Sequence, residues 1–377
     1  MKILTNTNFH SAGGIAKSAD ELARYCRRNN LPLVLVGADP QAQFSRSVNG
    51  SVITYRLPVG KGIENSRQVY ASAQNLDDLH SNLSQLKDSL NYIFAQEKPD
   101  LVLTQGTFYA PWMLHHVAKT KKIPTVVAYA GILTKEEAHA PKPLFSIFEA
   151  MEQEFNEASN FYIFPSRLTK TEVEKIFGRS LNDSSRVIPN GVSQEFFEKR
   201  KVGCQNEGIG FVGRNHEIKN LEFLLQLADN LKGSKNNFSI SAVSNIREGE
   251  PIRSQLTERG VSIHDSMGMR ELRDYYHSNG VVISPSHFET YGNVPLESVS
   301  AGTPALVSKN MGVSEVFQSL GLSNLVVDFN NVLEVINKIQ EVNTERISGS
   351  VKSVIRESLA WPNIVDQYFD FARELTS

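Results

Sequence analysis

Hydrophobic residues in the first half of the chain gather in short continuous runs, with longer polar and helical stretches between them. Runs of about four to eight apolar residues are typical of parallel strands that are buried on both faces. Over 15–29, by contrast, Ala19, Leu22, Ala23 and Cys26 recur at helical spacing and predict an amphipathic helix. The predicted strands of this half are 2–5, 33–36, 100–103, 124–127, 161–164 and 187–188.

A second series of strands begins near residue 208 and also alternates with helices, which are clearest over 221–231 and 269–277. The segment 195–207 is charged and poor in apolar residues after its start, which is typical of a linker. Two doubly wound α/β domains joined near residue 200 are therefore predicted. The predicted strands of this half are 209–212, 238–243, 261–264, 281–283 and 305–307.

Composition narrows the functional class. The chain has 377 residues, 40% of them hydrophobic and 21% charged, and a formal net charge of -2, which gives no general attraction to nucleic acid. Its two cysteines, Cys26 and Cys204, stand far apart and indicate neither a disulfide framework nor a zinc site. No apolar run approaches the roughly 20 residues that cross a bilayer. We expect a cytoplasmic protein without an integral membrane segment, and attachment to the membrane surface stays open.

In doubly wound sheets, ligands bind beyond the carboxyl ends of the strands, so the loops after the strands are the places to look for chemistry. The first such loop holds Gly13 and Gly14 just before the predicted helix 15–29. Paired glycines allow close backbone approach, and a helix N-terminus attracts anions. This pattern fits a phosphate loop and a simple tight turn equally well.

A second loop follows the predicted strand 209–212. Residues 208–213 spell Gly-x-Gly-x-x-Gly, but the apolar residues of this match are themselves the strand, whereas a dinucleotide fingerprint follows a strand and opens a helix. A dehydrogenase is therefore not favoured. The loop carries Arg214 and Lys219 just before a helix, and two such cations suit a diphosphate.

The third loop follows the strand 281–283 and contains two glutamates, Glu289 and Glu297. We expect Asn293 to cap a helix, Pro295 to lie in its first turn and Gly302 to end it. Glu297 then lies four residues past Asn293 on one helix face, where its carboxylate can accept both hydroxyls of a ribose. The backbone amides of 291–294 would bind a leaving phosphate.

The string Pro285-Ser-x-x-Glu289-Thr-Tyr-Gly-x-x-x-x-Glu297, with Gly302-Thr-Pro304 after it, resembles the Glu-x7-Glu signature of glycosyltransferase family 4. Further matches follow in family order across most of the chain. This resemblance implies the GT-B fold, in which two Rossmann-like domains face one another across a cleft. It implies an acceptor-binding domain over 1–195, a nucleotide-sugar domain over 206–360, and a helix over about 361–377 that packs back on the first domain. The further matching segments are 13–14, 166–170, 187–192, 211–220, 264–276 and the segment that opens at Trp361.

The resemblance also implies roles for single residues. Glu297 would hold the ribose, Arg214 and Lys219 would neutralise the diphosphate, and Glu289 would contact the donor sugar. Family members retain the anomeric configuration. The remaining donor-binding positions are Gly13 and Gly14 at the phosphates, Met267 in the base-binding segment, and Tyr291, Gly292, Asn293 and Val294 at the sugar and leaving phosphate.

No metal and no cofactor are expected. Asp-x-Asp occurs nowhere in the chain, and the cations Arg214 and Lys219 can replace a divalent metal ion at the phosphates. The expected substrates are a nucleotide-diphosphate sugar, with UDP favoured and GDP next, and a hydroxyl acceptor that is a small polar metabolite, a glycan or a lipid.

One departure from the family concerns the acceptor side. Where the family often carries His-Asp, this chain has Ala128-Tyr129-Ala130-Gly131, which leaves His10, Tyr129 and His139 as acceptor-site candidates. Two alternatives stay open: a nucleotide-sugar 2-epimerase with the same fold, and a sugar-nucleotide-binding protein without activity.

Overall fold

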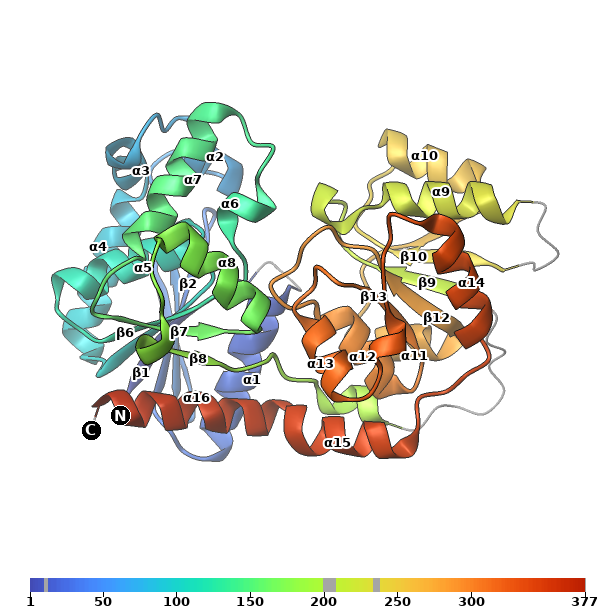
Figure 1. The fold of residues 1–377 in the computed structure, drawn as a ribbon. Coiled ribbons are helices and arrows are strands. Elements are labelled where there is room, and N and C mark those ends of the chain that lie inside the picture. The colour runs from blue at the N-terminus through green and yellow to red at the C-terminus, as the bar shows by residue number, and fades with distance from the viewer. Residues whose placement is uncertain (10–12, 199–207, 233–237, 377) are drawn as a thin grey trace. The chain divides into compact units, whose positions relative to one another are not determined.

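A computed structural model describes residues 1–9, 13–198, 208–232 and 238–376 of the chain. They form two compact units, one of 1–189 with 364–377 and one of 190–363 (Figure 1). Residues 190–195 group with the second unit, although the sequence analysis assigned them to the first domain. Part of the expected linker, 199–207, lies outside the described residues.

The first unit is built on an eight-stranded sheet in the order β3-β4-β2-β1-β5-β6-β7-β8. All neighbours pair in parallel except β3 and β4, which form an antiparallel hairpin at the edge. The central strands β1 and β5 are buried along their whole length, as continuous apolar runs require. The strands are β1 (Ile3–Thr7), β2 (Leu33–Ala38), β3 (Ser45–Asn49), β4 (Val52–Leu57), β5 (Leu101–Gln105), β6 (Thr125–Ala128), β7 (Asn160–Phe164) and β8 (Ser185–Val187).

Helices of the first unit cover this sheet and connect its parallel strands. The predicted helix over 15–29 is confirmed as α1, with its apolar side buried and Arg27 and Arg28 in its last turn. The helices are α1 (Gly14–Arg28), α2 (Ser66–Ala71), α3 (Leu76–Asn82), α4 (Ser84–Glu97), α5 (Tyr109–Thr120), α6 (Leu133–Glu136), α7 (Lys142–Glu154), α8 (Arg167–Phe177) and the short 3-10 turn η1 (Asn182–Ser184).

The second unit has a six-stranded sheet in the order β11-β10-β9-β12-β13-β14, and every pair of neighbours is parallel. All five strands predicted for this half are confirmed. The strands are β9 (Gly208–Val212), β10 (Ile240–Val243), β11 (Ser262–His264), β12 (Asn279–Ser284), β13 (Ala305–Ser308) and β14 (Val326–Val327). The helices are η2 (Gln194–Phe197), η3 (Glu217–Lys219), α9 (Glu222–Leu231), α10 (Pro251–Glu258), α11 (Met269–Ser278), α12 (Asn293–Ala301), α13 (Val313–Ser319), η4 (Ser323–Leu325), α14 (Val332–Val342) and α15 (Gly349–Leu359).

The segments by which the chain enters and leaves the second unit lie side by side. Val192 pairs with Ala360 in a parallel bridge, and the Val192 amide donates to the Leu359 carbonyl oxygen at 2.7 Å. A Cβ atom on Gly191 would stand 2.5 Å from the Trp361 ring, so glycine is required for this close packing. The final helix, α16 (Trp361–Thr376), begins here.

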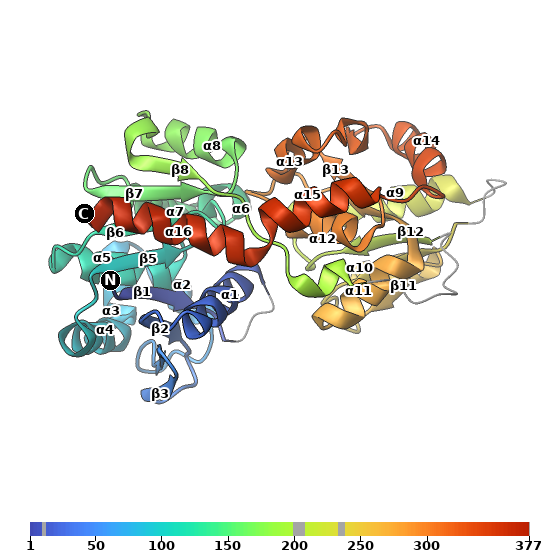
Figure 2. The same cartoon turned by 90° about the horizontal axis from the view of Figure 1, so that it is seen from below.

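From Ile364 onward, α16 belongs to the first unit and lies along it (Figure 2). Phe369 stacks on Tyr25 of α1 at a ring-centroid distance of 5.7 Å, and Arg186 pairs with Glu374 at 3.0 Å. Tyr25 also donates to the Asp366 carboxylate, and this contact raises the pKa of Tyr25 to about 12. The helix therefore packs back on the first unit. In the described ranges, no helix is both long and apolar enough to span a bilayer.

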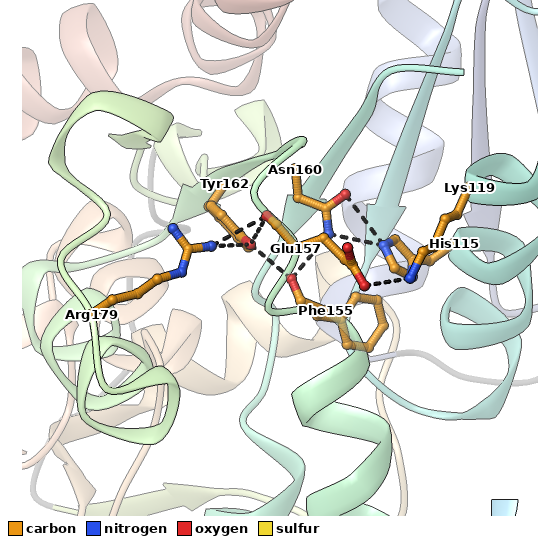
Figure 3. A network of polar contacts seen from close by, with 7 residues as sticks. All are labelled: His115, Lys119, Phe155, Glu157, Asn160, Tyr162 and Arg179. Carbon is orange, nitrogen blue, oxygen red and sulfur yellow. Dashed lines mark hydrogen bonds and ion pairs between the residues drawn. The ribbon is translucent and has the colours of Figure 1, made fainter. Parts of the chain in front are cut away.

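A polar network ties the end of α5 to the start of β7 in the first unit (Figure 3). The side-chain nitrogen of Asn160, Nδ2, lies 2.9 Å from His115 Nε2 and also donates to the Phe155 carbonyl oxygen at 3.0 Å. Tyr162 donates to the same carbonyl oxygen at 2.7 Å. His115 itself is only 1% exposed, and burial lowers its pKa to about 4.

This buried histidine predicts acid sensitivity of the first unit. Its pKa is about 4 in the folded protein, against about 6.5 for an ordinary histidine side chain. Between these two pH values the unfolded chain binds more protons at His115 than the folded chain does. The free energy of unfolding is therefore highest above pH 6.5 and falls as the pH drops toward 4. The shift corresponds to about 3 kcal/mol. Urea unfolding followed by circular dichroism should show this loss. His115→Gln should reduce it but not abolish it, because burial also lowers the pKa of the neighbouring His116 to about 4. An unchanged pH dependence in the variant would assign the effect to other groups, such as His116.

Candidate active site

The glycines of the Gly-x-Gly-x-x-Gly match do not form a phosphate loop. Gly208 is the first residue of β9 and Gly210 lies within it, whereas the predicted strand began at residue 209. A Cβ on Gly208 would stand 2.8 Å from Asn279 Oδ1, and one on Gly210 would stand 3.0 Å from Asn279 Cγ. These two glycines therefore make room for the buried side chain of Asn279 next to the strand.

The loop after β9 brings Lys219 next to Glu289, 70 residues further along the chain. Lys219 Nζ lies 2.8 Å from Glu289 Oε2, and the two side chains are only 17% and 18% exposed. The other carboxylate oxygen, Oε1, accepts a hydrogen bond of 2.6 Å from Ser286 Oγ. Each oxygen of Glu289 thus has a donor, and the lysine charge is balanced within the second unit.

Backbone and amide contacts hold the two loops together. The His287 amide donates to the Ile218 carbonyl oxygen at 2.9 Å, and Asn220 Nδ2 donates to the Pro285 carbonyl oxygen at 3.2 Å. Asn220 has a φ of 54°, a left-handed conformation that asparagine adopts more readily than most residues. Arg214 lies in the same loop but is exposed, and Lys219 is the cation that the described contacts tie to Glu289.

Helix α12 starts one residue earlier than an N-cap at Asn293 would place it. Gly292, with a φ of 92°, is the N-cap, and Asn293 is the first helical residue, so the prediction that Asn293 caps the helix is wrong. A side chain at position 292 would be strained at this φ and would meet Met311 Cε at 2.3 Å. Pro295 lies in the first turn, and Gly302 ends the helix with a φ of 101°, both as predicted.

The first turn of α12 presents unpaired backbone amides and the positive end of the helix dipole. Asn293 is half-buried, and its Oδ1 accepts a hydrogen bond of 3.0 Å from Asn190 Nδ2. Val294 is also half-buried, whereas Tyr291 is 2% exposed. Because its ring is buried, Tyr291 offers a ligand its backbone rather than its side chain.

Glu297 lies on the same helix and is 6% exposed. Tyr276 of α11, itself fully buried, donates to Glu297 Oε2 at 3.1 Å. Burial, and then the negative charge of Glu297, hold the pKa of Tyr276 well above its usual value, so the hydroxyl stays a donor. Tyr276 therefore fixes the orientation of the Glu297 carboxylate.

Met267 lies in the same unit, in the loop between β11 and α11, and is half-buried. The predicted site residues of the second unit thus follow the carboxyl ends of β9, β11 and β12, all in one parallel sheet. Within the described ranges, no three His, Cys, Asp or Glu side chains are grouped so that they could hold a metal ion.

The predicted residues of the first unit occupy different environments. Gly13 is the extended N-cap of α1, and Gly14 is its first, exposed residue. Tyr129 is 2% exposed, and its ring is tilted against that of Phe164 at a centroid distance of 5.3 Å. Its hydroxyl has no partner among the described residues. His139 is exposed in the loop before α7, and His10 lies outside the described residues.

Three residues contact the predicted site although no role was predicted for them from the sequence: Ser286, Tyr276 and Asn190. Ser286 stands three residues before Glu289, inside the string that was compared with the family. Tyr276 and Asn190 also lie in segments that match the family. Their contacts with Glu297 and Asn293 join positions 21 and 103 residues apart, which no local pattern reveals.

Two family models match the chain, one on each side of residue 200. The model described as "Glycosyltransferase Family 4" matches residues 12–196, and the one described as "Glycosyl transferases group 1" matches residues 206–344. The chain belongs to these glycosyltransferases. The family resemblance read from the sequence is therefore confirmed.

Similar proteins and structures agree with this assignment. A D-inositol 3-phosphate glycosyltransferase from Acidothermus cellulolyticus is 26% identical over 211 residues, which cover 49% of this chain and 46% of that protein. The match thus spans about half the length of this relative. Sucrose-phosphate synthase from Thermosynechococcus elongatus superposes on this chain with a TM-score of 0.77 at 16% identity. The superposition covers 100% of this chain and 99% of the synthase chain.

A UDP-forming α,α-trehalose-phosphate synthase from Burkholderia vietnamiensis has a TM-score of 0.72 at 11% identity, and each chain is covered to 100%. At such low identities these two structures show the fold alone. That fold is the GT-B type predicted from the sequence, with two Rossmann-like units.

Proposed function

We propose that this glycosyltransferase moves a sugar from a nucleotide-diphosphate donor to a hydroxyl acceptor, with retention of the anomeric configuration and without a metal ion. The observation that carries the proposal is the Lys219–Glu289 pair, at 2.8 Å, in the loops at the carboxyl ends of β9 and β12. A lysine charge and the N-terminal amides of α12 suit the charge that develops on a departing diphosphate.

The reaction requires the glycosidic C–O bond of the donor to break while negative charge grows on the phosphate oxygen. Lys219, and Arg214 in the same loop, would stabilise that charge in place of a divalent cation. Retention would follow from attack on the same face of the sugar, with the departing phosphate taking the proton of the acceptor hydroxyl. Glu289 would contact the sugar ring, and Glu297 the ribose.

Uracil is the base that we favour for the nucleotide of the donor. It is the leading expectation of the sequence analysis, and the structurally similar Burkholderia protein is described as UDP-forming. A thermal-shift panel with UDP, GDP, ADP and NAD tests the base directly. A ligand at about 100 times its dissociation constant stabilises the folded protein by roughly 2.7 kcal/mol. No shift with any nucleoside diphosphate would contradict the proposed donor class.

A donor screen then tests the reaction. The wild type is incubated with UDP- or GDP-sugars and mixed hydroxyl acceptors, with and without EDTA, and the anomeric configuration of the product is read by NMR. A glycoside of retained configuration, formed equally with EDTA, supports the whole proposal. An epimerised nucleotide sugar would identify the 2-epimerase alternative, and binding without any turnover would identify the inactive binding protein.

Glu297→Ala is expected to raise the Michaelis constant for the donor by about 10- to 100-fold, because hydrogen bonds to a charged group contribute about 1.5–3 kcal/mol. The value of kcat should change little, because the ribose is held alike in ground and transition states. Initial rates over a range of donor concentrations measure both. Glu222→Ala, an exposed acid on α9, is the control. An unchanged donor constant would reject the ribose role of Glu297.

A further inference from the structure

We propose that Ser286 is a positioning residue for the transfer reaction: its hydroxyl orients Glu289, and Glu289 in turn holds the Lys219 ammonium where the donor diphosphate needs it. The inference rests on the proposed function, because it assigns Lys219 to the diphosphate. It assigns to Ser286 no contact with substrate.

The first support is the geometry of the Glu289 carboxylate. Ser286 Oγ donates to Oε1 at 2.6 Å, and Lys219 Nζ lies 2.8 Å from Oε2. A carboxylate that accepts at both oxygens has its last torsion fixed. If the bond to Oε1 were missing, the group could rotate, and Lys219 would lose the fixed direction of its partner.

The second support is that the backbone around this chain of contacts is already held. Both neighbours of Ser286 are bonded to the segment of Lys219, through the Pro285 carbonyl oxygen and the His287 amide. The Glu289 amide donates to the Asn310 carbonyl oxygen at 3.2 Å, and the Gly312 amide donates to the Glu289 carbonyl oxygen at 3.0 Å. The side chains of Glu289 and Lys219 are therefore the parts of this group that can still change conformation.

The third support is the burial and shape of the serine site. Ser286 is 2% exposed, so its hydroxyl sits at a defined place in the loop. Lysine has a flexible four-carbon stem, and its ammonium needs an oriented partner to occupy a single position. A preorganised charge stabilises a transition state better than one that must first be ordered. Ser286 therefore acts on the rate through two intervening side chains.

The decisive comparison is Ser286→Thr against Ser286→Val. The two side chains have nearly the same shape, but threonine keeps the hydroxyl and valine replaces it by a methyl group that also excludes water. We expect the valine variant to have a kcat at least about tenfold below that of the threonine variant, as loss of a charge-assisted hydrogen bond implies. Equal rates in the two variants would overturn the proposal.

A buried serine elsewhere in the same unit supplies the control. Ser300 on α12 donates to the Leu296 carbonyl oxygen at 2.7 Å and is fully buried. Ser300→Ala removes a comparable hydroxyl and should keep its kcat within about threefold of the wild type. A loss in this control as large as in Ser286→Val would assign the effect to general packing and overturn the positioning role.

A second measurement does not depend on turnover. The rate at which an amine-directed acylating reagent modifies Lys219, read by peptide mass spectrometry, reports how firmly the ammonium is paired. We expect modification several times faster in Ser286→Val than in Ser286→Thr, and equal rates would overturn the proposal. If the wild type transfers no sugar from any nucleotide donor, the proposed function fails, while the labelling comparison still decides the role of Ser286.

Discussion

Replacement of Lys219 by alanine is expected to lower kcat/KM for the nucleotide-sugar donor by at least about 10- to 100-fold, through two additive effects. The diphosphate loses a charge-assisted contact, for which about 1.5–3 kcal/mol is typical. In addition, Glu289 is 18% exposed and loses the cation that lies 2.8 Å from its Oε2. The carboxylate would then repel the phosphate charge that develops during transfer. Steady-state kinetics with varied donor measure the change.

Lys309→Ala is the matched control for this prediction. Lys309 follows β13 at the same edge of the sheet, but its side chain is 60% exposed and pairs with Asp328 at 3.0 Å. Lys309→Ala changes the net charge of the unit by the same amount as Lys219→Ala does. Because exposed ion pairs contribute little to stability, the fold should not suffer. A loss in Lys309→Ala equal to that in Lys219→Ala would show that general charge, and not the position of Lys219, attracts the donor.

Combining Lys219→Ala with Glu289→Gln separates the two effects. If the unpaired carboxylate causes part of the loss, neutralising it should recover that part, and the double variant should be more active than the product of the single effects predicts. If the two losses simply multiply, the residues act independently, and the ion pair carries no functional coupling. The comparison needs the same donor and acceptor in all four proteins.

The sequence predicted the central parallel strands well, because strands such as β1, β5 and β12 are buried along their whole length and read as largely apolar runs. Strand β3 has no such run: its five residues, Ser45–Asn49, are all exposed at the sheet edge. Its partner β4, Val52–Leu57, alternates apolar and polar residues and was also missed. An edge hairpin pairs through its backbone, which leaves little hydrophobic signal in the sequence.

At the candidate site, the sequence identified the loops but not their contacts. Arg214 and Lys219 looked equivalent as two cations before a helix, yet the structure pairs Lys219 with Glu289 and leaves Arg214 exposed. That difference depends on how two loops are held together across the sheet edge. The cap of α12 was misplaced for a local reason, since asparagine is a favoured cap residue but the turn requires the positive φ of Gly292.

A different kind of prediction concerns α16, which the sequence analysis expected to pack on the first unit. Phe369→Ala should destabilise that unit by about 3–5 kcal/mol, the usual cost of removing a buried phenylalanine ring. Phe369 is 2% exposed and stacks on Tyr25. With Ile3, Leu22 and Leu103 it also lines a small apolar cavity, which the truncation would enlarge.

The two tryptophans of the chain allow this effect to be localised. Trp112 is buried in the first unit and Trp361 in the second, so a Trp361→Phe background leaves Trp112 as the tryptophan reporter of the first unit. In that background, the urea midpoint of Trp112 fluorescence should fall strongly for Phe369→Ala. It should hardly move for Asp370→Ala, because that exposed residue forms a surface ion pair with Arg373 on the same helix, and such pairs contribute little to stability. Equal midpoints for the two variants would mean that α16 covers the first unit without stabilising it.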